Sequence, residues 1–259
     1  MYSKSCVPSV EKYISSIRDL IHSKYNTNYT KTDRELISLL WKGYESDTEI
    51  ISVEQTADDA AQRAIMRSLW SLIQQDEFLF FRYFSRSKFI PFIFGSCGHV
   101  YAVDSAPPTS VLHPGAMSIA RLSRDSWHDR AQAAIGLLDI IESAQSEFHE
   151  YLHLCDIKGK NFGIAKDGNI KAIDMDMVYF DSKLGPWLAK NHTHCSQNSD
   201  CDFISCFGQC NSTVGRCEEV INNNNLEVNI VPISSLWSPW AACNWHTFTY
   251  MWSFIQWRS

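Results

Sequence analysis

The sequence predicts an α+β protein that is mainly helical, with a small β component and a disulfide-rich insertion in its second half. Three observations predict this class. Apolar residues recur at three- and four-residue steps, short β-prone runs flank two turn-rich tetrads, and five of the nine cysteines crowd into residues 195–217. With 259 residues, 45% of them hydrophobic and 13% aromatic, the chain can build one large domain or two small ones around a packed core.

The first half is predicted to be helical up to a hairpin. Residues 9–41 are expected to form two amphipathic helices, and residues 58–84 one long helix with an apolar face. Residues 89–94 and 100–103 are β-prone and flank Gly95-Ser96-Cys97-Gly98. Such a glycine-containing tetrad predicts a turn between two antiparallel strands.

The second half is predicted to contain a long helix and a second hairpin. A proline-containing loop, residues 105–114, precedes a helix over residues 128–152. Residues 162–165 and 170–173 then flank Lys166-Asp167-Gly168-Asn169, an Asp-Gly turn typical of β-hairpins. The chain ends in a tryptophan-rich tail that polar residues interrupt too often for a membrane span.

The charge balance excludes one class of partner. The 29 acidic and 23 basic side chains give a net charge of −6, and no run of Lys or Arg forms a basic patch. Electrostatic binding to nucleic acid is therefore not expected.

The clustered cysteines predict disulfides. Their spacing suits cross-links better than the tight C-x-x-C pairs of zinc sites, although zinc is the alternative because His192 and His194 adjoin the cluster. Since nine is odd, at least one thiol stays unpaired within the chain, and Cys155 is the candidate. The predicted disulfide-forming residues are Cys195, Cys201, Cys206, Cys210 and Cys217.

Three glycosylation sequons accompany the cysteines. They begin at Asn28, Asn191 and Asn211. Clustered cysteines interleaved with sequons indicate an oxidising compartment. The N-terminus, however, has no apolar segment of a secretory signal, so the simplest expectation is a chain that lacks its natural N-terminal part.

A group of polar residues with the chemistry of phosphoryl transfer lies between the second long helix and the second hairpin. Asp156 can accept the proton of an attacking hydroxyl, Lys158 can contact the migrating phosphate, and Asn161 with Asp174 can hold Mg²⁺ against nucleotide phosphates. Asp176 is either a further Mg²⁺ or Mn²⁺ ligand or a solvated side chain. The alternative for the whole group is a hairpin flanked by capping acids.

This group resembles the catalytic and metal-binding loops of protein kinases, whose pattern is H-R-D-x-K-x-x-N followed, after a hairpin, by D-F-G. Here Leu154-Cys155 replaces the His-Arg pair and Met175-Asp176 replaces the Phe-Gly pair. Loss of the arginine removes the usual partner of an activation-loop phosphate. Three further features carry the resemblance: motifs between residues 69 and 138, the cysteine cluster, and the asparagine run at 222–225. Together with the loops, they are similar to the divergent, cysteine-rich kinase family of the endoplasmic reticulum and Golgi over roughly residues 60–230.

The resemblance implies a protein-kinase-like fold with a partial small lobe over residues 1–104 and a large lobe over residues 105–259. Glu77 would pair with the lysine that binds the phosphates of ATP, and a solvated helix residue is the alternative for it. Residues 104–108 would be the hinge beside the adenine. ATP with Mg²⁺ or Mn²⁺ is the implied cofactor, whereas no Ca²⁺ is expected because residues 57–63 lack the ligands of a calcium loop, and no zinc is expected.

Two functional hypotheses follow from the resemblance. No G-x-G-x-x-G motif and no lysine-bearing V-A-I-K strand precedes Glu77, so these parts, with a membrane anchor, are expected in a missing N-terminal region. The first hypothesis is a kinase that transfers the γ-phosphate of ATP to a hydroxyl of an unknown substrate. The second is a pseudokinase or scaffold that binds a luminal protein without catalysis. In either case the expected location is the endoplasmic reticulum or Golgi lumen, or outside the cell.

Overall fold

The computed structural model describes residues 10–27, 32–41, 59–107, 124–191 and 194–225, and its elements alternate helices with short strands. The helices are α1 (Val10–Tyr25), α2 (Asp33–Leu40), α3 (Asp59–Ile73), α4 (Asp76–Tyr83), α5 (Arg124–Ser146) and α6 (Asp181–Asn191), with the short 3-10 helices η4 (Gly159–Asn161) and η5 (Asn198–Asp200). None of the described helices is both long and apolar enough to span a bilayer.

The strands pair in small antiparallel sheets, in the order β1-β2, β3-β6, β4-β5 and β7-β8-β9. They are β1 (Ile93–Cys97), β2 (Val100–Val103), β3 (Leu152–Leu154), β4 (Phe162–Ile164), β5 (Ile170–Ala172), β6 (Val178–Phe180), β7 (Asp202–Phe203), β8 (Cys206–Asn211) and β9 (Arg216–Ile221). Helices combined with small antiparallel sheets confirm the predicted α+β class.

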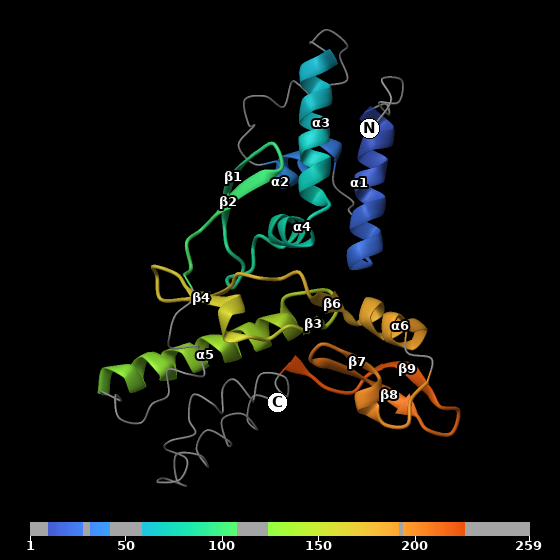
Figure 1. The fold of residues 1–259 in the computed structure, drawn as a ribbon. Helices are drawn as coiled ribbons and strands as arrows, with labels where there is room; N and C mark the ends of the chain where they lie inside the picture. Colours follow the sequence, from blue (N-terminus) through green and yellow to red (C-terminus); the bar gives the residue numbers. More distant parts are fainter. Residues whose placement is uncertain (1–9, 28–31, 42–58, 108–123, 192–193, 226–259) are drawn as a thin grey trace.

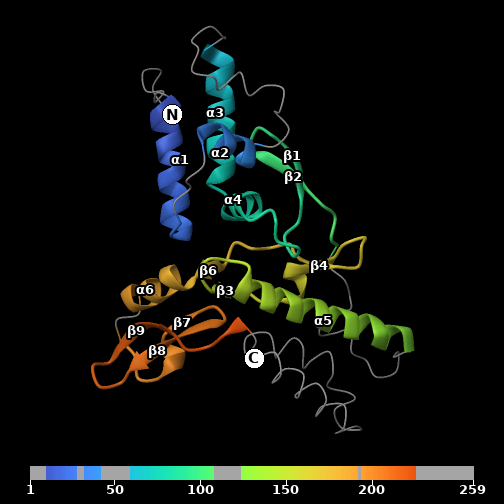
Figure 2. The ribbon, with the colours of Figure 1, turned by 180° about the vertical axis from the view of Figure 1, so that it is seen from behind.

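Helices α1 to α4 and the hairpin β1-β2 form the upper part of the molecule in Figure 1; we call them the helical region. The two amphipathic helices predicted within residues 9–41 are confirmed as α1 and α2. The Thr32 hydroxyl accepts from the Glu35 N–H, and the Glu35 carboxylate accepts from the Thr32 N–H, so a capping box starts α2. Helix α1 lies beside α3 (Figure 2), where the Tyr13 hydroxyl donates to the Met66 carbonyl at 2.8 Å.

The single helix predicted over residues 58–84 is wrong, because the chain breaks between α3 and α4. Gln75 has an extended backbone (φ −81°, ψ 115°) and redirects the chain. The four consecutive residues from Phe78 to Phe81 are all buried, so α4 is covered on every side, whereas α3 alternates buried and exposed positions. Apolar periodicity cannot locate such a break, since both segments contain enough apolar residues to continue a helix.

The first predicted hairpin is confirmed with shifted strands. Strand β1 begins at Ile93, four residues later than predicted, and Gly95 to Cys97 extend it instead of forming the turn. Gly98 and His99 make the turn, and Gly98 has a φ of +60°, which glycine adopts without steric cost.

In the lower part of the molecule, α5 is shifted toward the N-terminus relative to the prediction. It runs from Arg124 to Ser146 instead of over residues 128–152, and Leu152, the last residue of the predicted helix, belongs to β3 and pairs with Phe180 of β6. The second predicted hairpin is confirmed as β4 and β5, with Gly168 at φ +84° in its turn. Aromatic rings join the upper and lower parts: Tyr25, Phe80, Phe84, Phe148 and Phe180.

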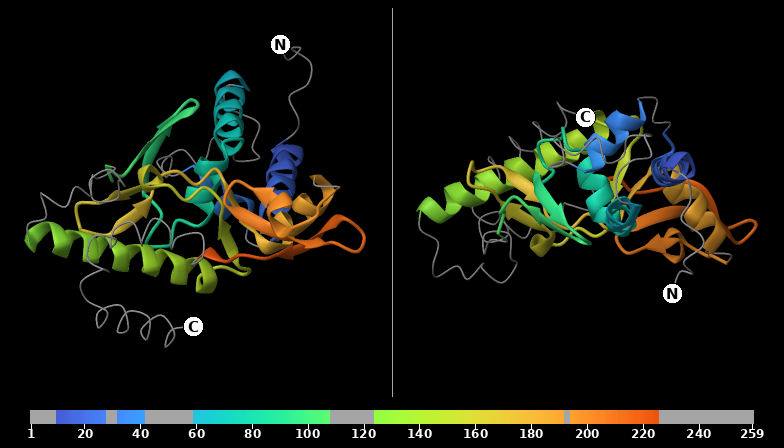
Figure 3. Two further views of the ribbon diagram at one scale, coloured as in Figure 1. Left: turned by 60° about the horizontal axis from the view of Figure 1, so that its bottom comes forward. Right: turned by 90° about the horizontal axis from the view of Figure 1, so that it is seen from above.

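The cysteine-rich module, defined as described residues 194–225, lies below α6 and on the opposite side of the molecule from the hairpin β1-β2 (Figure 3). It contains η5 and the sheet β7-β8-β9. Helix α6 packs closely on β9, because a Cβ atom at Gly185 would lie 2.4 Å from the Glu219 carbonyl oxygen.

All five clustered cysteines form disulfides, which confirms the prediction for them. The three bonds are Cys155–Cys206, Cys195–Cys210 and Cys201–Cys217. The prediction that Cys155 is free is wrong, and among the described cysteines the free one is Cys97. Three sulfur atoms of the cluster do lie within 4.8 Å of one another, but they belong to disulfides and so are not the thiolates that zinc requires.

Candidate functional site

Asp156 is held in a fixed position directly after β3. Its Oδ2 accepts a hydrogen bond from the Asn161 side-chain amide at 3.0 Å, and its Oδ1 lies 2.6 Å from the Lys158 ammonium. The preceding residue, Cys155, donates its N–H to the Met177 carbonyl at 3.0 Å. Asp156, Lys158 and Asn161, proposed from their spacing, therefore meet at one place.

Asn161 connects Asp156 to the second hairpin. It is 2% exposed, its Nδ2 also donates to the Asp156 carbonyl, and its own carbonyl accepts from the Ile173 N–H at 2.8 Å. Its Oδ1 is buried and has no hydrogen-bond partner among the described residues. A buried amide oxygen without a donor is a candidate ligand for a cation, because amide oxygens bind hard metal ions.

Asp174 and Asp176 follow β5 and come close to Asp156. Desolvation raises the pKa of the Asp176 carboxyl, and a hydrogen bond with Asp174 and the negative charges of Asp174 and Asp156 raise it further. Asp156 and Asp174 line one small pocket together with Met175. The structure thus brings three carboxylates to one point, where a cation would relieve their mutual repulsion.

Glu77 faces the same carboxylates from α4 in the helical region. Burial raises the pKa of its carboxyl, the hydrogen bond from the Tyr101 hydroxyl at 2.6 Å lowers it, and the charges of Asp174 and Asp176 raise it again. Tyr101 comes from β2, and its ring packs on Phe78 with 5.1 Å between centroids. Glu77 is thus half-buried and hydrogen-bonded to Tyr101, and its pairing with a lysine that binds the phosphates of ATP stays a prediction.

The segment predicted as the hinge runs along β4. Its described residues, 104–107, approach so closely that a Cβ atom at Gly163 would lie 1.8 Å from the Ala106 carbonyl oxygen. The Ile164 N–H donates to the Pro107 carbonyl at 3.4 Å. Glycine at this position allows the segment to cross over the hairpin that follows Asn161.

Several residues around the site were missed by sequence reasoning. Tyr101 lies in a motif that supported the resemblance, but its bond to Glu77 had no sequence signal. The asparagine run has no role that its sequence predicts; in the structure, Asn223 and Asn225 accept hydrogen bonds from backbone N–H groups of β8 and β3. The pairing of Cys155 with Cys206, 51 residues away, cannot be deduced from spacing.

The sequons differ in their surroundings. Asn191 is exposed at the end of α6. Asn211 is half-buried, donates to the Glu218 carboxylate at 2.9 Å and accepts from the Thr213 N–H. Asn28 lies outside the described residues.

A helix that carries a glutamate above a loop–hairpin unit with Asp156, Asn161 and Asp174 defines a protein-kinase-like domain. More particularly, residues 69–233 match the family model of the protein-kinase domain of FAM69, and the chain belongs to this family. The match includes every residue of the candidate site, whereas α1 and α2 precede it. No solved structure matches the chain.

Proposed function

We propose that this domain transfers the γ-phosphate of ATP to a hydroxyl of its substrate in the full-length protein. The observation that carries the proposal is the orientation of the Asn161 amide. Its nitrogen holds Asp156, which would act as the base, and its buried oxygen is left without a donor. One side chain can thus position the base and contribute a metal ligand at the same time.

The donor set fits Mg²⁺ or Mn²⁺, because Asn161 and Asp174 supply oxygen atoms and Asp176 adds a third oxygen ligand. When bound, the metal ion would neutralise charge on the phosphates of ATP. Asp156 would accept the hydroxyl proton. Lys158, whose ammonium lies 2.6 Å from Asp156, would compensate the negative charge that develops on the phosphate nearby.

The experiment is a measurement of Mg²⁺- and Mn²⁺-dependent ATP turnover by the full-length protein. Asp156→Asn is expected to lower kcat by about 100- to 10,000-fold, the usual contribution of a general base, and Asp174→Asn is expected to remove metal-dependent turnover. Asp167→Asn is the matched control, because Asp167 lies in the nearby hairpin turn and bonds only locally to Asn169. Equal turnover in all three variants would contradict the proposal.

A second candidate function is a pseudokinase that binds a partner without catalysis. It is favoured by the contact of Glu77 with Tyr101, since no lysine pairs with Glu77 in the described part of the chain. Turnover separates the candidates, and thermal unfolding with ATP and Mg²⁺ shows whether nucleotide binds. Measurable turnover supports the kinase. Stabilisation by nucleotide without turnover supports a nucleotide-binding pseudokinase, and the absence of both supports a scaffold that binds no nucleotide.

The three disulfides indicate that the protein folds in an oxidising compartment. We infer that this compartment is the lumen of the endoplasmic reticulum or Golgi, as the exposed sequon at Asn191 also suggests. A mobility shift on deglycosylation that is lost in Asn191→Gln would test the assignment.

A further inference from the structure

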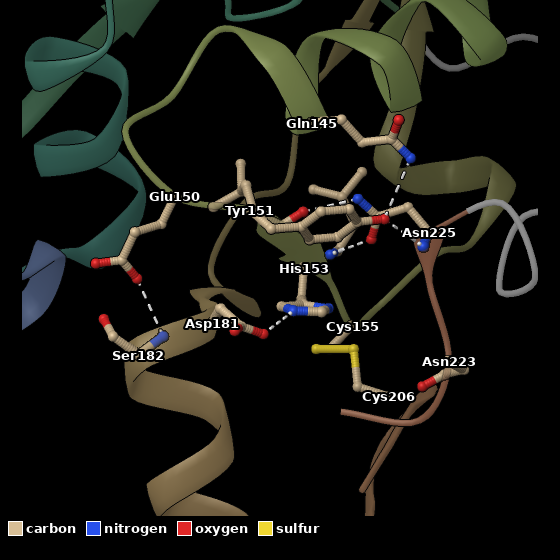
Figure 4. A network of polar contacts seen from close by, with 12 residues as sticks. Gln145, Glu150, Tyr151, His153, Cys155, Asp181, Ser182, Cys206, Asn223 and Asn225 are labelled. Carbon is tan, nitrogen blue, oxygen red and sulfur yellow. Dashed lines mark hydrogen bonds and ion pairs between the residues drawn. A yellow bond between two sulfur atoms is a disulfide. The ribbon is translucent and has the colours of Figure 1, made fainter. Parts of the chain in front are cut away.

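The cysteine-rich module contacts the segment that leads into Asp156, β3 and Cys155, at three points. Cys206 forms the disulfide with Cys155, and the Asn225 side chain bonds to the backbone of β3 (Figure 4). The Ser205 N–H also donates to the Cys155 carbonyl at 3.0 Å. The other two disulfides of the module close within it. The module is therefore joined to the candidate site through a small number of identified groups.

Asn225 substitutes for a neighbouring strand at the outer edge of β3. Its Nδ2 donates to the Leu152 carbonyl at 2.7 Å, and its Oδ1 accepts from the Leu154 N–H at 2.9 Å. Its own N–H donates to the Tyr151 hydroxyl at 3.1 Å, and the residue is 1% exposed. Since β6 pairs with the other edge, β3 is held by hydrogen bonds on both sides.

Cys155 is immobilised by its side chain and by both of its backbone groups. Its N–H donates to Met177 and its carbonyl accepts from Ser205, while its sulfur is bonded to Cys206. Both cysteines are fully buried. Asp156 is the next residue, so the position of its Cα atom is set by Cys155 on one side and by the bonds to Asn161 on the other.

We propose that the cysteine-rich module positions the base of the site, with Cys206 and Asn225 as the positioning residues. The inference rests on the proposed function, because it assigns Asp156 that role. In the kinase pattern an arginine precedes the aspartate; here Cys155 occupies that place and connects the loop to the module through a covalent bond.

The test compares two disulfide-deleted variants of the full-length protein by hydrogen exchange and kinetics. In Cys155→Ala/Cys206→Ala, exchange of the amides of residues 154–161 is expected to rise, and kcat is expected to fall about 100-fold, the effect of a displacement near 1 Å, with an unchanged KM for ATP. In the matched control Cys195→Ala/Cys210→Ala, which keeps the bond to the loop, both quantities are expected to stay near those of the parent protein.

A loop whose exchange is unchanged without the Cys155–Cys206 bond would overturn the inference. An equal loss of kcat in the control, while β8 and β9 keep their protection from exchange, would also overturn it. If the double variant does not fold, Asn225→Ala decides, because it keeps the three disulfides and removes the side-chain bonds to β3; exchange of residues 154–161 is again expected to rise. If the parent protein has no turnover, the proposed function fails, whereas the exchange comparison still shows whether the module restrains the loop.

Discussion

The helical region and the cysteine-rich module achieve stability by different means. The helical region buries many large apolar side chains, among them Phe78, Phe80 and Phe81, and none of its described residues forms a disulfide. The module, residues 194–225, is shorter than the roughly 40 residues below which a domain rarely folds on a hydrophobic core alone. Its buried residues are mainly cysteines, and covalent bonds replace the missing apolar burial.

The candidate site lies between these two regions. Glu77 comes from α4 of the helical region, while Asp156 follows a residue that is bonded to the module. Glu77 therefore depends on apolar burial, and Asp156 depends on disulfides. Truncation of the aromatic core should affect Glu77 first, whereas reduction of the disulfides should affect Asp156 first.

Reduction of the disulfides is expected to have the largest effect. Each of the two disulfides within the module closes a loop of 15 or 16 residues, and such a loop contributes about 3 kcal/mol to stability. Reduction should unfold the module and leave α3 and α4 protected from hydrogen exchange. The control is alkylation without reductant. Simultaneous loss of protection in both regions would show that they form a single cooperative unit instead.

Truncation of the aromatic core should have the next largest effect, in the opposite region. Phe80 is buried and its ring lies 4.9 Å from that of Phe84. Phe80→Ala is expected to lower the free energy of unfolding by about 3–5 kcal/mol in chemical denaturation, with exchange rising first in α1 and α4. Phe94→Ala, at an exposed position of β1, is the matched control and should change stability by less than about 0.5 kcal/mol.

The same contrast explains how much could be predicted from the sequence. Helices α1 and α2 and the hairpin β4-β5 follow from local periodicity and an Asp-Gly turn, and Asp156, Asn161 and Asp174 follow from their spacing around that hairpin. The break before α4 could not be predicted, because tertiary burial of all its faces decides it.

Contacts that span many residues were also out of reach. The prediction of a free thiol at Cys155 rested on its place in the predicted catalytic loop, and only the fold brings Cys206 to it, 51 residues away in the sequence. The role of Asn225 depends on an exposed strand edge whose location is known only once β3 is paired with β6.

A change in pH should act on β3, between the two regions. His153 is buried, its Nε2 lies 2.9 Å from the Asp181 carboxylate, and its ring packs on Tyr151. Burial lowers the pKa of His153, and the hydrogen bond and charge of Asp181 oppose this shift only in part. The unfolded chain therefore binds the proton more readily, and stability is lost as the pH falls through the unfolded pKa of about 6.5.

His153→Gln should remove part of that loss, measured as the difference in Tm between pH 7.5 and 5.5. Asp181→Asn, which removes the group that opposes the shift, should instead make the loss steeper. The raised pKa values of Glu77 and Asp176 favour stability at low pH, but they are common to all three proteins and cancel in the comparison. An unchanged pH dependence in His153→Gln would show that another group controls it.

The smallest expected effect concerns a strained turn in the module. Ile204 has a φ of +59°, a conformation that costs a β-branched residue about 1–2 kcal/mol, and its side chain is 45% exposed, so burial compensates only part of this cost. The turn brings Ser205 and Cys206 to Cys155, and these contacts maintain the strained conformation of Ile204.

Because asparagine tolerates this conformation, Ile204→Asn is expected to raise the local stability of β7 and β8 by about 1 kcal/mol in hydrogen exchange. Val214→Asn, a more exposed residue whose φ is not positive, should give no gain. A loss of stability in Ile204→Asn would mean that apolar contacts of Ile204 outweigh the strain, and the module would then depend on burial more than its disulfides suggest.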